Sequence, residues 1–550
     1  MNTAMFPKPL STAPVHPAAI LAALTFALAM TAAAKAQPAS GPAGTSRPAQ
    51  GRPAAAAAAH KAGQFVIEPA TLDVSPTEKI EYELGTLYVP ENRAEPNSRI
   101  IGVGFARFKS SAPTQAPPTF HLPGGPGVSY VASLKGVSAH MLRFREFGDV
   151  VLVDQRGCSG RGDVLRYAYR TADEPLDQPA GLGRSTAAFV QVSRDAVAQF
   201  AGKGIDLRGY TVKECAEDVN DLRKALGYEK ISLVGVSFGS QWSFATMRLH
   251  PEIVARALLS GVEPLDFGYD MPSHVLAAMQ RYWKAAEQDK ALQPYIPPGG
   301  LEAAAKAVLQ RLERGPVRVA VKDPKGGPAT VVTLGKEDFQ RDFLHPAAAG
   351  PAFVLALYHE RYEAWAASVL AKRRARQNDL RLVGPLIDTS LGVTPGRERQ
   401  LRSDPATAFL GQWNWDSYIA SAGIWPTADV GDDFRTPVET PIPIVFAQGD
   451  WDVQTPVENT LTIAKSFPKG RVIIAEHGGH GVLDPIAARF PKVWGQMMDF
   501  LRTGSLPDLP ERVTLVARAI AGARGIPFEE MERLLADNTA RVFGVHVEGP

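Results

Sequence analysis

The sequence is poor in cysteine, in long apolar runs and in excess charge of either sign. Its 550 residues include only two cysteines, neither in a CxxC pair, which excludes a disulfide-dense scaffold and a cysteine-ligated metal site. The formal net charge is +2 and no run of basic residues occurs, so neither nucleic acid nor an anionic membrane surface is an expected partner. The apolar content of 45% and the charged content of 21% are those of an ordinary globular protein.

One long apolar stretch is present, near the N-terminus. Residues 18–34 read AAILAALTFALAMTAAA, follow the positively charged Lys8, and lead into Ala34-Lys35-Ala36, which has the small-x-small form of a cleavage site. We expect residues 1–36 to be a signal peptide cleaved after Ala36, which leaves a secreted or periplasmic protein with no membrane contact. A retained anchor is the alternative, but the stretch is shorter than the roughly 20 apolar residues of a spanning helix.

Export bears on the two cysteines, Cys158 and Cys215. An even pair in an oxidising compartment suggests a disulfide, so we expect these two residues to be bonded. Two buried free thiols are the alternative.

The chain after the signal peptide divides into five segments. Residues 37–63 are rich in Ala, Pro, Gly and Ser and are expected to form a disordered linker, because they cannot bury a core. In residues 64–266 and 431–504, antiparallel strands precede apolar strands that alternate with helical segments, which predicts an α/β fold with a mostly parallel sheet flanked by helices. Residues 267–430 are mostly helical and are expected to form a cap, and residues 505–550 a helical extension.

A nucleophilic serine is the first candidate for chemistry. The apolar run 231–236 leads directly into Gly235-x-Ser237-x-Gly239, and a helical segment follows. In this strand–turn–helix context the pattern holds a serine hydroxyl clear of the sheet. The two glycines are needed because side chains at their positions would clash across the sharp turn.

A serine hydroxyl needs a base and an orienting acid, which this type of fold supplies later in the chain. An acid follows the apolar strand at 442–447, where Asp450 and Asp452 both lie in Gly-Asp-Trp-Asp-Val-Gln-Thr-Pro. We favour Asp452 from its place in the Gly-x-x-Asp-x-x-Thr-Pro pattern. Asp450 is expected to bond the loop backbone, as turn aspartates often do.

A histidine follows the next apolar strand, at 471–475. His477 and His480 are both candidates for the base, and His480 is favoured because the glycines beside it let it swing towards the serine.

Backbone N–H groups for an oxyanion complete the expected site. The residue after the nucleophile, Phe238, supplies one donor, and the loop Gly124-Gly125-Pro126-Gly127 is expected to supply the other. We favour Gly125 over Gly124. Each element alone has an unremarkable reading as a turn or a structural residue, but all four in this order predict a catalytic site that needs no metal and no organic cofactor.

These motifs resemble those of the prolyl iminopeptidase and tripeptidyl aminopeptidase family of α/β-hydrolases. The matching pieces are Gly124-Gly-Pro-Gly127, Asp154-Gln-Arg-Gly157, Gly235-Val-Ser-Phe-Gly239, Gly449-Asp-Trp-Asp-Val-Gln-Thr-Pro456 and Gly479-His-Gly481. They span about 115–265 and 435–500, so the core is covered and the cap is not. Many iminopeptidases have histidine directly before the glycine loop; here Pro123 takes that place and His121 lies two residues earlier, which favours the tripeptidyl branch.

The resemblance implies a serine peptidase that releases residues from the free N-terminus of short peptides. Such enzymes need acidic groups for the α-ammonium, and Glu263 and Glu360 are the candidates, with ordinary surface carboxylates as the alternative. A secreted esterase or amidase on the same scaffold is the closest other function, because the three site residues do not separate esters from amides. A non-catalytic binding protein of this fold is the third.

Overall fold

The computed structural model describes residues 60–515, apart from 76–77, 114–115, 137–138, 159, 291, 324–325, 344–349 and 414. The expected signal peptide, most of the expected linker and most of the C-terminal extension lie outside these residues. Within them, no helix is both long enough and apolar enough to cross a bilayer.

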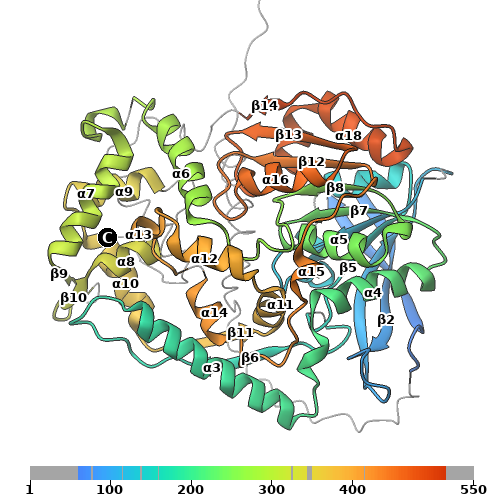
Figure 1. Cartoon of the computed structure of the whole chain (residues 1–550), viewed down its shortest axis with the longest axis horizontal. Coiled ribbons are helices and arrows are strands. Elements are labelled where there is room, and N and C mark those ends of the chain that lie inside the picture. Colours follow the sequence, from blue (N-terminus) through green and yellow to red (C-terminus); the bar gives the residue numbers. More distant parts are fainter. Residues whose placement is uncertain are drawn as a thin grey trace, which may run out of the picture.

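A ten-stranded sheet forms the right-hand part of the molecule in Figure 1. In spatial order its strands are β1 (Phe65–Ser75), β2 (Glu78–Pro90), β3 (Ile100–Phe108), β5 (Val150–Val153), β4 (Thr119–Leu122), β7 (Ile231–Val236), β8 (Val254–Ser260), β12 (Ile444–Gly449), β13 (Gly470–Glu476) and β14 (Arg512–Thr514). The pairings from β1 to β5 are antiparallel, and all those from β5 to β14 are parallel. The predicted α/β fold with a mostly parallel sheet is confirmed.

Helices bury both faces of this sheet. Because successive side chains of a strand point to opposite faces, one apolar strand contributes to two cores. In β5, Val151 packs in the core under α4 (Val212–Ala225) and α5 (Phe238–Leu249), whereas Leu152 packs in the core under α18 (Pro491–Thr503). The other helices beside the sheet are α2 (Ala139–Leu142), α16 (Val457–Ile463) and α17 (Leu483–Arg489).

A second body of helices is inserted between β8 and β12. Its helices are α6 (Pro272–Ala286), α7 (Gly300–Arg314), α8 (Lys336–Asp342), α9 (Gly350–Tyr358), α10 (Glu363–Arg373), α11 (Val383–Leu391), α12 (Pro395–Ser403), α13 (Thr407–Leu410), α14 (Asp416–Ser421) and α15 (Asp432–Arg435). It also contains the antiparallel hairpin of β9 (Val317–Val321) and β10 (Thr330–Leu334). Most of these helices pack around a separate core that includes Trp283, Phe339 and Trp365. By contrast, α11 and α15 contribute Leu386 and Phe434 to the core under α4 and α5. We call this body the cap.

The cap also takes up a segment that the sequence assigns to the core. Strand β6 (Arg166–Arg170) pairs with β11 (Gln377–Arg381) of the cap, and α3 (Leu182–Gly202) runs along the cap's lower side (Figure 1). Arg373 ties the two segments together, because its Nη1 donates to the carbonyls of Pro175 and Gln178 at 3.0 and 2.7 Å. Both strands are short and polar, so neither carries a sequence signal for this distant pairing.

The described part of the C-terminal extension, residues 505–515, contains a strand. It adds strand β14 in parallel to the outer edge of β13. Residues 516–550, the rest of the predicted helical extension, lie outside the part of the chain that the structure describes.

Candidate active site

Ser237 occupies a strained turn between β7 and α5. Its backbone has φ 58° and ψ −130°, a conformation that residues with a side chain rarely adopt. A Cβ atom on Gly235 would lie 2.4 Å from the carbonyl oxygen of Gly239, and one on Gly239 would lie 2.1 Å from that of Leu122. Both positions therefore require glycine, and the turn leaves the Ser237 side chain partly exposed at the start of α5.

Asp452 and His480 form the acid–imidazole pair that lies at this edge of the sheet. Asp452 is 1% exposed, and its Oδ2 lies 2.9 Å from Nδ1 of His480. The carboxylate also accepts hydrogen bonds from the backbone N–H groups of Gln454 and Thr455, from the Thr455 hydroxyl and from the Gln448 amide. These donors hold the carboxylate in one orientation, so it fixes the ring that it contacts.

The two groups of the pair shift each other's pKa. Burial alone would raise the pKa of Asp452, but His480 and the hydrogen bonds from Thr455 outweigh burial and lower it. Burial would likewise lower the pKa of His480, but the Asp452 carboxylate outweighs it and raises that pKa. The pair therefore favours a charged carboxylate beside an imidazole that readily takes up a proton.

The other two candidates of these loops have different partners. Asp450 accepts the backbone N–H of His477 at 2.7 Å, so it bonds the loop backbone. The ring of His477 lies 3.0 Å from the carbonyl oxygen of Leu515 through Nδ1 and 4.7 Å from the ring of Trp451. Among the described residues, neither Asp450 nor His477 hydrogen-bonds to Ser237, Asp452 or His480, so the geometry favours Asp452 and His480.

Gly261 lies between the imidazole and the serine. A Cβ atom at this position would be 3.2 Å from Cε1 of His480 and 3.3 Å from the backbone nitrogen of Ser237. The same nitrogen donates to the carbonyl of Ser260 at the end of β8, at 3.0 Å. Residues from β7, β8 and the loop after β13 thus converge within a few ångströms.

The expected oxyanion donors border the same point. Phe238 is the first residue of α5, and the first N–H groups of a helix have no acceptor within it. A Cβ atom on Gly124 would lie 3.1 Å from Cβ and 3.6 Å from Oγ of Ser237, so only glycine lets this loop approach the serine so closely.

The family follows from comparison with known proteins. Residues 122–485, which include all the site residues above, match the family model of the alpha/beta hydrolase fold. The chain belongs to the α/β-hydrolase fold family. A stretch of 188 residues is 28% identical to proteins named serine protease Hip1 from Mycobacterium tuberculosis and Mycobacterium bovis, and it covers 33% of this chain and 36% of those relatives. The match thus spans about a third of their length.

Solved structures of this hydrolase fold are also similar to the chain. A thermophilic esterase from Thermogutta terrifontis has 14% sequence identity and a TM-score of 0.31, with 76% of this chain and 99% of that chain covered. The esterase EaEST from Exiguobacterium antarcticum has 13% identity and a TM-score of 0.32, again with 76% and 99% covered.

Three carboxyl groups near the hydrolase site have strongly raised pKa values. Burial raises the pKa of Glu263 well above its ordinary value, and Asp270, Asp388 and Asp452 raise it further. Burial also raises the pKa of Asp270 to about 7 and that of Asp388 to about 8. Each of the three residues is nevertheless partly exposed. We call Glu263, Asp270 and Asp388 the acidic cluster.

The sequence indicated only one member of this cluster. Glu263 is predictable because it follows β8 by three residues. Asp270 precedes α6, where Asn459 donates to its carboxylate at 2.6 Å, and Asp388 belongs to α11 of the cap. No local sequence pattern marks Asp270 or Asp388 as a site residue. Among the residues that the structure describes, no group of three or more His, Cys, Asp or Glu could hold a metal ion.

Glu360, the second predicted acid, is not brought to this cluster. It lies in the turn between α9 and α10 with its side chain 69% exposed, 3.6 Å from Arg311. Its expected role in binding an amine finds no support in its surroundings.

The predicted disulfide is not formed. Cys158 and Cys215 are both free thiols in the structure. Burial raises the pKa of both, that of Cys215 to about 12, and so keeps the thiols protonated. An even cysteine count allows a disulfide but carries no information on the geometry that the bond requires.

Proposed function

We propose that this protein is a serine hydrolase that releases residues from the free N-terminus of short peptides. The observation that carries the proposal is the hydrogen-bonded pair of Asp452 and His480 beside Ser237, with the acidic cluster in the same region. The family assignment supports hydrolase chemistry, and the relatives named serine protease are consistent with a peptide substrate.

The proposed reaction begins with proton transfer from Ser237 to Nε2 of His480 as the serine oxygen attacks the substrate carbonyl. The carbonyl π electrons move to oxygen, where the N–H groups of Phe238 and Gly125 stabilise the negative charge. Collapse of this intermediate breaks the C–N bond, and the imidazolium returns its proton to the departing amine. Water then repeats the sequence on the serine ester, which releases the acid. Asp452 remains ionised and stabilises the imidazolium throughout.

The acidic cluster supports recognition of an α-ammonium group. Burial disfavours ionisation of all three carboxyls, and the neighbouring acids disfavour it further at Glu263, so a bound cation would remove part of that cost. Asp270 also lines a small pocket together with Trp413 and Trp415. The resemblance to N-terminal peptidases agrees with acidic side chains in this region.

A substrate panel tests the proposal. We expect hydrolysis of p-nitroanilides that carry one, two or three residues with a free α-amine, and loss of that activity when the amine is acetylated. Asp270→Asn should raise KM for the free-amine substrates by about 10–100-fold, the value of a charged hydrogen bond, and leave the hydrolysis of p-nitrophenyl acetate, which has no amine, unaffected. Glu360→Gln is the matched control and should leave KM unchanged. Equal rates on free and acetylated substrates, or a preference for p-nitrophenyl esters alone, would contradict the peptidase assignment in favour of an esterase or amidase.

We also propose that the protein is exported after removal of residues 1–36. The apolar stretch and the Ala34-Lys35-Ala36 sequence support this. The mass of the mature protein tests it: a chain that begins at Gln37 is expected, and one that retains residues 1–36 would contradict export by a cleaved signal.

A further inference from the structure

The glycine loop beside Ser237 is held by the side chain of Gln155. This residue is 1% exposed and follows β5. Its Oε1 accepts the backbone N–H of Gly127 at 2.7 Å, and its Nε2 donates to the carbonyl oxygen of Gly124 at 3.1 Å. One amide side chain therefore contacts both ends of the loop, once as acceptor and once as donor.

The bond to Gly124 fixes the direction of a neighbouring N–H group. The carbonyl of Gly124 and the N–H of Gly125 belong to the same peptide unit, which is planar, and in the trans form its C=O and N–H point in opposite directions. Because Gln155 holds the carbonyl on its own side, the N–H of Gly125 points away from Gln155. The bond to Gly127 has the complementary effect, since it occupies the N–H of Gly127 and removes that group as an oxyanion donor.

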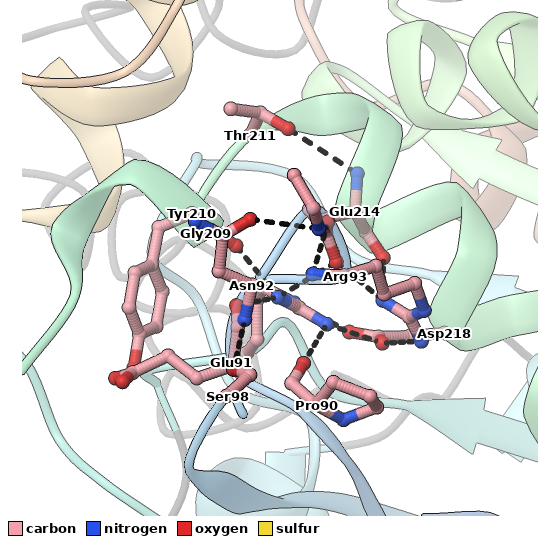
Figure 2. Close-up of polar contacts among 12 residues, drawn as sticks. Pro90, Glu91, Asn92, Arg93, Ser98, Gly209, Tyr210, Thr211, Glu214 and Asp218 are labelled. Atoms are coloured by element: carbon pink, nitrogen blue, oxygen red, sulfur yellow. Dashed lines mark hydrogen bonds and ion pairs between the residues drawn. The ribbon is translucent and has the colours of Figure 1, made fainter. Parts of the chain in front are cut away.

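The turn that carries Gln155 is itself anchored in a buried ion network. Arg156 has a side chain with no exposed surface, and its Nε and Nη2 donate to the two oxygens of Asp218 on α4 at 2.8 and 2.6 Å. Its Nη1 donates to the carbonyls of Glu91 and Gly209 at 2.7 and 2.6 Å. Arg93 donates to Asp218 as well, at 2.7 Å (Figure 2). Loss of a partner from such a buried network is strongly destabilising, so the turn has a single well-defined position.

Asp154, the residue before Gln155, connects the same turn to the segment that follows the glycine loop. Asp154 accepts the hydroxyl of Ser129 at 2.7 Å and the backbone N–H of Val131 at 3.0 Å. Asp154 thus holds the chain just after the glycine loop, and Gln155 holds both ends of the loop.

We propose that Gln155 is a positioning residue that orients the Gly125 N–H as the second oxyanion donor of the Ser237 site. The inference rests on the proposed hydrolase function and adds a residue with no expected role in the chemistry. Gln155 does not touch the substrate, and its effect reaches the reaction through one peptide plane. Its contribution is therefore made in the transition state, where the oxyanion exists, and not in substrate binding.

Two replacements of Gln155 distinguish an effect on the orientation of the Gly125 N–H from a loss of protein stability. Gln155→Met keeps the length of the side chain and removes both hydrogen bonds. Loss of one oxyanion donor costs about 10²–10³-fold in kcat, so a misdirected donor should cost about 10–100-fold, with KM for p-nitrophenyl acetate changed less than about threefold. Gln155→Glu keeps the acceptor for Gly127 and donates to Gly124 only when its carboxyl is protonated. The ratio of its kcat to that of wild type should therefore fall as the pH rises.

Ser129→Ala is the matched control, because it removes a bond between the same two loops without touching the 124–125 peptide unit. We expect its kcat to stay within about threefold of wild type even if its melting temperature falls. A folded Gln155→Met protein with wild-type kcat, a pH-independent ratio for Gln155→Glu, or an equal loss in Ser129→Ala would each overturn the proposed role. A wild-type protein that neither reacts with a fluorophosphonate nor hydrolyses any ester would overturn the proposed function itself and this inference with it.

Discussion

Replacement of Asp452 by asparagine should abolish most activity while leaving the fold intact. The Oδ1 position accepts two backbone N–H groups, from Gln454 and Thr455, which cannot reorient. The single oxygen of an asparagine must therefore take that position, and its NH₂ group must take the position of Oδ2, which faces Nδ1 of His480. Nδ1 then has to accept a hydrogen bond, so the ring proton moves to Nε2. An imidazole protonated at Nε2 cannot take the proton of Ser237.

The expected loss follows from this wrong tautomer. An equivalent exchange in a Ser-His-Asp site costs about 10⁴-fold in kcat, and we expect about 10³–10⁴-fold here at neutral pH. The substitution also leaves the Gln448 amide and the Thr455 hydroxyl without their acceptor at Oδ2. At about 1 kcal/mol for each hydrogen bond, the free energy of unfolding should fall by about 2 kcal/mol. This leaves the variant folded, so the loss of activity reports chemistry.

The pH dependence provides a second readout. Activity requires a neutral imidazole, so wild-type kcat/KM should rise with pH through a midpoint above 6.5, the ordinary pKa of histidine, because Asp452 raises the pKa of His480. The residual activity of Asp452→Asn should have its midpoint at lower pH, because the carboxylate no longer stabilises the charged ring.

The assay is hydrolysis of p-nitrophenyl acetate, followed across pH, with urea unfolding measured in parallel. Asp450→Asn is the control, because Asp450 lies two residues away and accepts the backbone N–H of His477 at 2.7 Å. Its kcat should stay within about threefold of wild type. The reasoning is refuted if Asp452→Asn retains more than a tenth of wild-type kcat, or if Asp450→Asn shows the larger loss.

Three further predictions concern stability and cysteine chemistry. Gly239→Ala should lower the free energy of unfolding by at least about 3 kcal/mol, because the new Cβ would lie 2.1 Å from a backbone oxygen of β4, whereas Gly160→Ala, with no atom within 4 Å, should cost little; equal urea midpoints would contradict this. At pH 8, the free energy of unfolding of Asp388→Asn should exceed that of wild type by more than about 1.4 kcal/mol, the value of one pKa unit. At pH 4, the variant should not be more stable than wild type. The sign follows because its folded pKa of about 8 lies above the ordinary 3.8, so the wild type loses stability as pH rises between these values; a lower stability of the variant at pH 8 would refute it. Without a reductant, iodoacetamide should leave Cys158 and Cys215 unmodified in the native protein and modify both after unfolding, as read by intact mass; no modification after unfolding would demonstrate a disulfide.

The central sheet and the order of its parts were predictable because they depend on local patterns. Apolar runs such as 231–236 and 442–447 are buried strands, and turn residues mark where each ends. Parallel strands of one sheet bring their carboxyl ends to the same edge, so residues far apart in the chain, such as Ser237 and His480, could be placed together from strand order alone.

The contacts of the cap were not predictable from such patterns. The pairing of β6 with β11 joins residues about 200 positions apart in two short polar strands, and no periodicity marks either of them. Asp388 reaches the acidic cluster from a cap helix, so its position depends on how the cap sits over the sheet. Glu360, chosen for its charge in the same region of the chain, lies on the outer side of the cap.

The choice between neighbouring candidate residues also required the three-dimensional structure. Asp450 and Asp452 follow the same strand two positions apart, and only the hydrogen bonds show that one holds the loop and the other the imidazole. Gln155 belongs to a motif that the sequence reveals, but its two bonds to the glycine loop depend on the close approach of β4 and β5.

Labelling of Ser237 by a fluorophosphonate is the most direct test of the proposed nucleophile. Intact mass spectrometry and peptide mapping of the folded protein should show one adduct, located on Ser237, and Ser237→Ala should show none. A folded wild-type protein that remains unlabelled, as a non-catalytic binding protein of this fold would, or an adduct on another serine, would contradict the assignment of Ser237.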